Sequence, residues 1–98
     1  MILKEIKESL KTSSHPVARA LHKGEHFKVI ALGMNKGMVL KEHKAQLPTK
    51  LFVLEGSVMY HEGDKKESLL PYDEIQIPVN VTHSVEAISD CLCLLTQG

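Results

Sequence analysis

Histidines are the residues of this chain best suited to chemistry, because imidazole titrates near neutral pH and binds metal ions. His43 and His83 differ from the other histidines, since each lies where a strand-like apolar run meets a loop. Alternation along a strand puts His83 on the face of Val85 and Ala87, which is apolar and expected to point inward. A buried imidazole needs hydrogen-bond partners, so two inward histidines predict a pocket with polar content.

The other histidines are expected at the surface; they are His15, His22, His26 and His61. His22 and His26 have the i,i+4 spacing of a helical metal pair, but Gly24 lies between them and no helix is expected there. His61 stands at the polar end of the run SVMYHE, where it is expected to face solvent.

Two cysteines, Cys91 and Cys93, lie in the strand-like run CLCLLT. On a strand they would share one face with their Cα atoms roughly 6.6 Å apart. That separation is near the outer limit for a disulfide, and the side chains would be badly aimed for one. We expect both to be reduced, buried and without activated-thiol chemistry.

Length and composition limit the classes of function. The 98 residues suit a single domain, 1–98, and Lys+Arg and Asp+Glu balance at 12 each. A neutral chain with few aromatic residues has neither the basic surface nor the stacking surface of a nucleic-acid partner, and it has no membrane-spanning apolar run. The N-terminal segment MILKEIKESLK lacks the apolar core of a signal peptide, so a cytoplasmic protein is expected.

The first twelve residues differ in pattern from the rest. Ile2, Ile6 and Leu10 recur every four residues with charged residues between them, which predicts a short amphipathic helix or arm over 1–12. A helix this short is marginal alone, so it must pack on the body of the protein or on a partner.

After Pro16 the pattern becomes that of an all-β protein. Eight to ten short strands are predicted, with a turn signal every eight to twelve residues, as in a sandwich or small barrel. Glu55-Gly56 is expected to form a hairpin turn, with Gly56 in a backbone geometry that other residues resist. Which face of residues 51–55 points inward stays open, because Leu51 and Val53 are as apolar as their neighbours.

Residues 34–96 resemble a small cupin, a jelly-roll family with two short motifs. Gly37, His43 and Gly56 stand at matching positions of the first motif, and Pro78 and His83 at matching positions of the second. Other motif positions differ. The second histidine and the glutamate of the first motif are replaced by Ala45 and Thr49, and three positions of the second motif hold Tyr72, Asn80 and Ala87.

The resemblance implies a cupin-type jelly-roll β-barrel and, because many single-domain cupins dimerise, a homodimer. In metal-binding cupins the motif histidines and glutamate hold a divalent ion, and by this correspondence only His43 and His83 could do so here. Two imidazoles are too few for a tight site, since zinc takes three or four protein ligands. We therefore expect no tight physiological metal, leaving only weak or adventitious divalent binding, and the identity of any cofactor open.

The function favoured by these features is non-catalytic binding of a small molecule or anion in the barrel. The expected lining is His43, His83, Phe52, Leu54, Met59 and Val85. Two alternatives stay open: a metal-dependent cupin enzyme of isomerase or dioxygenase type, and a protein–protein module. Whether the chain is an enzyme is not determined by its sequence.

Overall fold

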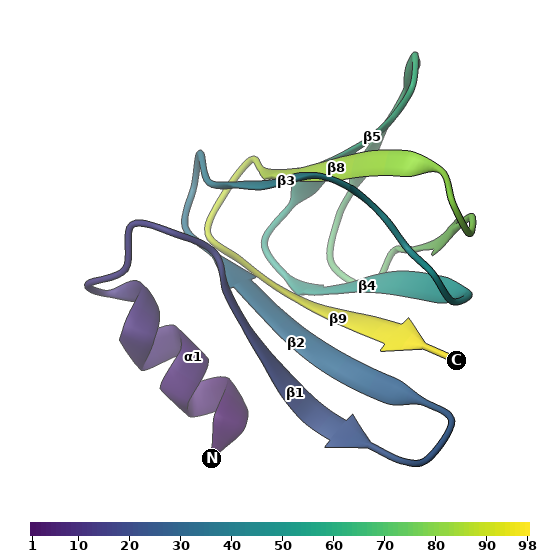
Figure 1. Cartoon of the computed structure of the whole chain (residues 1–98). Coiled ribbons are helices and arrows are strands. Elements are labelled where there is room, and N and C mark those ends of the chain that lie inside the picture. The colour runs from purple at the N-terminus through teal and green to yellow at the C-terminus, as the bar shows by residue number, and fades with distance from the viewer.

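The alternating pattern after Pro16 forms nine β-strands, which follow one N-terminal helix in a computed structural model that describes residues 1–98 (Figure 1). The elements are α1 (Ile2–Leu10), β1 (Val17–Lys23), β2 (Lys28–Met34), β3 (Val39–Lys44), β4 (Thr49–Glu55), β5 (Val58–Glu62), β6 (Lys65–Leu69), β7 (Glu74–Ile77), β8 (Thr82–Ala87) and β9 (Cys91–Gln97). The predicted all-β class is confirmed.

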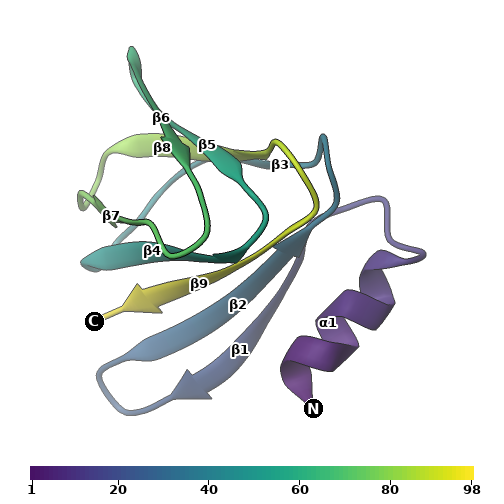
Figure 2. The same ribbon diagram turned by 180° about the vertical axis from the view of Figure 1, so that it is seen from behind.

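Two antiparallel sheets form a cupin-type jelly-roll barrel, as predicted. One sheet has the order β1-β2-β9-β4-β7 and the other the order β3-β8-β5-β6 (Figures 1 and 2). Apolar side chains from the inner faces of both sheets form one cluster, which includes Leu32, Leu51, Val53, Val58 and Val85. This cluster fills the space between the sheets, as close packing of protein interiors requires.

Helix α1 lies against the outer face of the larger sheet, beside β1 and β2, as both ribbon views show (Figures 1 and 2). Its apolar stripe therefore packs on its own chain. Ile6 is fully buried, and it forms a second apolar cluster with Leu10, Ala31 and Leu92. A Cβ on Gly33 would lie 2.5 Å from Cγ2 of Ile6, so the absence of a side chain there lets the helix sit directly on the sheet.

The turn at Gly56 differs from the prediction. It does not close a hairpin, because β4 belongs to one sheet and β5 to the other, so it carries the chain between the sheets. Gly56 does have a positive φ of 76°, the conformation expected for it. A hairpin and a crossing turn have the same residue types, and only strand pairing distinguishes them.

No helix of this structure is long and apolar enough to cross a membrane.

Candidate functional site

His43 and His83 come from distant parts of the chain and meet at one end of the barrel. They are direct cross-strand partners on β3 and β8, and their ring centroids are 4.2 Å apart, with the ring planes inclined by 56°. The register of the two strands is irregular between Leu40 and His43. Leu40 pairs with Val85 and His43 with His83, so β3 takes three residue steps between these pairs where β8 takes two. That extra residue is a bulge, and it lets both pairs face the same side of the sheet.

Hydrogen bonds fix the tautomer of both rings. Nδ1 of His43 lies 2.9 Å from the carbonyl oxygen of Lys41, and Nδ1 of His83 lies 3.2 Å from that of Val81. A carbonyl oxygen can only accept, so each neutral ring carries its proton on Nδ1 and donates it there. Nε2 of each ring is then a lone-pair acceptor without a hydrogen-bond partner in the protein, free to meet a ligand.

Both histidines were expected to be buried, and this holds for His83 only. His83 is only 3% exposed, whereas the His43 side chain is exposed to solvent. Burial lowers the pKa of His83, and the neighbouring His43 acts in the same direction, while hydrogen bonding to Val81 and the charge of Glu62 oppose them. His83 is therefore a neutral imidazole near pH 7, shielded behind a ring that reaches water.

This burial predicts a pH dependence of stability. His83 has a lower pKa in the folded chain than its ordinary value of 6.5, so the unfolded chain binds more protons below that pH. The contribution to stability is complete above about pH 6.5 and is lost as the pH falls through the folded-state pKa. Urea unfolding between about pH 5 and 8 should therefore show a steeper acid-side loss in the wild type than in His83→Gln. Parallel profiles, or a His83 ring signal in NMR that titrates above 6.5, would contradict this assignment.

Tyr60 and Glu62 complete the polar group, and neither is among the lining residues expected from the sequence. The Tyr60 ring is fully buried and stacks on His83 at a centroid distance of 5.9 Å, and its hydroxyl donates to Oε1 of Glu62 over 2.8 Å. Burial raises the pKa of Tyr60, and the hydrogen bond to Glu62 adds to the effect. We call His43, His83, Tyr60 and Glu62 the mouth cluster.

The signal for Tyr60 was present in the sequence. Val58, Tyr60 and Glu62 alternate along β5, so placing Val58 inward would have placed the tyrosine inward too. The outer face of β5 carries Met59 and His61, and His61 lies 3.5 Å from Glu86 there.

Three of the expected lining residues lie elsewhere. Phe52 and Leu54 point to the outer face of β4, because Thr49, Leu51 and Val53 take the inner face. Leu54 packs against the helix cluster, and Met59 faces outward on β5 for the same reason of alternation. Val85 lies on the inner face with His83. A strand whose two faces are both apolar gives no sequence signal of which one is buried, and the tertiary contacts decide it.

The ligand positions of metal-binding cupins do not fit a metal ion in this chain. Ala45 is buried and offers no donor atom, and the hydroxyl of Thr49 donates to the carbonyl of Leu47 over 2.8 Å. No group of three or more His, Cys, Asp or Glu side chains is placed to hold a metal ion. Two imidazoles without a carboxylate or thiolate are a poor match for zinc or for non-haem iron.

Comparison with solved structures identifies related folds. A cupin superfamily protein from Desulfitobacterium hafniense has a TM-score of 0.81 at 18% identity, over 87% of this chain and 78% of that one. An RmlC-like cupin from Desulfovibrio desulfuricans has a TM-score of 0.77 at 25% identity, over 84% and 80% of the two chains. A protein containing a cupin-2 domain from Shewanella frigidimarina has a TM-score of 0.77 at 17% identity, over 99% and 92%. No protein-family model matches the sequence, and no curated protein matches it significantly.

Proposed function

We propose, on the premise that this chain is a small cupin-domain protein, that it binds a small polar molecule at the mouth cluster without transforming it. The observation that carries the proposal is the pair of Nδ1–H tautomers. Each ring is held by a backbone carbonyl, and its Nε2 has no hydrogen-bond partner in the protein. Fixed polar groups at the edge of an apolar interior are typical of small-molecule sites.

The mouth cluster is rich in hydrogen-bond acceptors. Both Nε2 atoms are acceptors in the neutral rings, and so are the oxygens of the Glu62 carboxylate. The Tyr60 hydroxyl already donates its hydrogen bond to Glu62, so only its acceptor capacity remains. A ligand that presents O–H or N–H groups would satisfy these acceptors. Sugars, polyols and amides are molecules of this kind.

An anion is the less supported of the two ligand types expected from the sequence. Burial lowers the pKa of His83, so this ring does not supply a positive charge near pH 7. The Glu62 carboxylate beside Tyr60 would also repel an anionic group. The site therefore favours neutral ligands over carboxylates.

Binding can be tested with two matched sets of probes. Glucose, mannose and myo-inositol form the neutral set, and acetate and glucuronate form the anionic set. We expect members of the neutral set to shift the ring signals of His43 and His83 in NMR at pH 7.5, and His43→Ala and His83→Ala to abolish binding. His15→Ala, at an exposed position remote from the cluster in sequence, is the control and should bind as the wild type does. Equal binding by all variants, or no response to either set, would overturn the proposal.

A metal-dependent isomerase or dioxygenase is the alternative with less support. One feature favours it: metal-ligating histidines commonly donate their second ring N–H to a backbone carbonyl, as both rings do here. The ligand count opposes it, because no third donor joins the pair. Elemental analysis of protein purified without a polyhistidine tag separates the two, since the enzyme needs stoichiometric metal and the binding protein does not.

A further inference from the structure

Three sulfur-bearing side chains gather at the end of the barrel away from the mouth cluster. Cys91 and Cys93 lie two residues apart on β9, and both point into the barrel interior, where they join the main apolar cluster with Met34. His83 is near the start of β8, whereas Cys91 follows the end of that strand. Four residues of extended chain separate His83 from Ala87, roughly 13 Å, so the two sites are independent.

Strand register brings the three side chains together. Met34 on β2 is the direct partner of Cys91 on β9, and Leu32 is the partner of Cys93. Direct partners have Cβ atoms about 5 Å apart, and a diagonal neighbour is within reach of a long side chain. The Met34 thioether is thus opposite one thiol and diagonal to the other. Met34 and Cys93 are fully buried, and Cys91 is 5% exposed.

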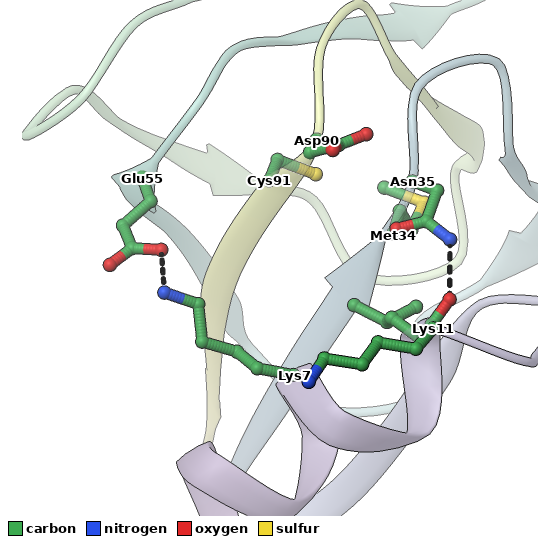
Figure 3. Close-up of a pocket in the computed structure, with 8 residues that line it drawn as sticks. Lys7, Lys11, Met34, Asn35, Glu55, Asp90 and Cys91 are labelled. Atoms are coloured by element: carbon green, nitrogen blue, oxygen red, sulfur yellow. Dashed lines mark hydrogen bonds and ion pairs between the residues drawn. The ribbon is translucent and has the colours of Figure 1, made fainter.

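A cavity of about 420 Å³ opens onto this group from solvent (Figure 3). Met34 and Cys91 form part of its wall, and Figure 3 shows the Cys91 sulfur directed toward the side where Met34 and Asn35 lie. Lys7 of α1 and Lys11, the residue that follows the helix, also line the cavity. A small ion in this cavity would therefore meet Met34 and Cys91 first, while Cys93 is fully buried and does not line the cavity.

We propose that Cys91, Cys93 and Met34 form a binding site for a thiophilic monovalent metal ion, for which Cu(I) is the best match. Thiolate and thioether sulfurs are the donors that Cu(I) prefers, whereas magnesium, calcium and manganese prefer oxygen. The three sulfurs come from adjacent antiparallel strands, whose hydrogen bonding holds their spacing. The fourth sulfur nearby, that of Met38, already accepts a hydrogen bond from the backbone N–H of Asn35 over 3.3 Å.

The charges balance in this reaction. Two neutral thiols each lose a proton, Cu(I) binds both thiolates and the thioether, and the metal keeps its oxidation state. The product carries one net negative charge, and the charged side chains that line the cavity are two cations and two anions, Lys7 and Lys11 with Glu55 and Asp90. Hydrogen bonding between the thiols already lowers the pKa of Cys91, while the pKa of Cys93 is raised by the same contact and by burial. A coordinating metal deprotonates such a thiol directly.

The experiment uses the reduced full chain without an affinity tag. Cu(I), kept reduced by ascorbate, is titrated in competition with the chelator bathocuproine disulfonate, and thiolate-to-copper absorption in the ultraviolet is recorded. We expect a single Cu(I) per chain. Cys91→Ser and Cys93→Ser should each weaken Cu(I) binding by more than about 100-fold. That exceeds the loss in metal affinity that is typical when a residue outside the ligand set is changed. Met34→Leu, of similar volume, should weaken it about tenfold while the chain stays folded.

Two variants are matched controls. Met38→Leu removes a nearby sulfur that is already engaged, and His43→Ala disrupts the mouth cluster; both should bind Cu(I) as the wild type does. The proposal would be overturned if Met34→Leu and one of the two cysteine variants each bound Cu(I) with unchanged affinity. It would also be overturned if the wild type showed no binding in competition with the chelator. Loss of binding in His43→Ala alone would place the copper at the mouth cluster and equally reject the sulfur site. Circular dichroism of each variant confirms that the fold is retained.

Discussion

Gly56→Ala is expected to leave little folded protein at room temperature. A Cβ at this position would lie 2.1 Å from the carbonyl oxygen of Asp90 and 2.8 Å from Cα of Cys91, and these are backbone atoms that cannot rotate away. The positive φ of 76° adds strain for any residue with a side chain. Backbone strain and overpacking together should cost about 3–5 kcal/mol, a large part of the stability of a small domain. Urea unfolding followed by circular dichroism measures this loss.

Gly63→Ala is the matched control for that experiment. Gly63 also has a positive φ, of 58°, but no atom lies within 4 Å of a Cβ added there. The substitution should therefore cost only the intrinsic penalty of the left-handed conformation, about 1 kcal/mol. Similar losses in the two variants would show that the crossing turn between β4 and β5 is not held by the close approach of Gly56 to the start of β9.

Ile6→Ala should release helix α1 from the barrel. Ile6 is fully buried between the helix and the larger sheet, and truncation of such a side chain typically costs about 2–4 kcal/mol. A helix of nine residues is marginal on its own, so most of its stability depends on this contact. We expect the amide protons of residues 2–10 to exchange much faster with solvent, measured by NMR, while amides of β9 lose less protection.

Lys4→Ala is the appropriate comparison for Ile6→Ala. Lys4 is on the same helix but is exposed, and a surface substitution of this kind usually changes stability by less than about 0.5 kcal/mol. If the helix amides of Ile6→Ala stayed as protected from exchange as those of Lys4→Ala, the apolar stripe of α1 would not be what holds the helix on the barrel.

The proposed mouth site and the proposed sulfur site lie at opposite ends of one barrel, and each has its own access to solvent. Between them the interior is packed with apolar side chains, including Leu51, Val53 and Val58. A packed interior of this kind leaves no continuous channel from one end to the other. Binding at one end should therefore be measurable without interference from the other, as the His43→Ala control requires.

The all-β class followed from the sequence because alternation and turn residues are local signals. Nine strands form, within the predicted range of eight to ten, and Asn80 adopts the left-handed conformation that asparagine tolerates, with a φ of 63°. Strand pairing is not local. The Glu55-Gly56 turn therefore joins two sheets, although its residue types suit a hairpin equally well.

The sequence alone shows two histidines at expected strand–loop junctions, and it shows Ala45 and Thr49 at two of the four positions that hold ligands in metal-binding cupins. Which side chains meet those histidines depends on the tertiary fold. The register of β3 on β8, with its bulge, places the two rings side by side. The alternation of side chains along β4 and β5 places Tyr60 on the inner face, and it places Phe52, Leu54 and Met59 on the outer face. Where both faces of a strand are apolar, composition alone does not distinguish them, because the choice depends on which face the opposite sheet covers.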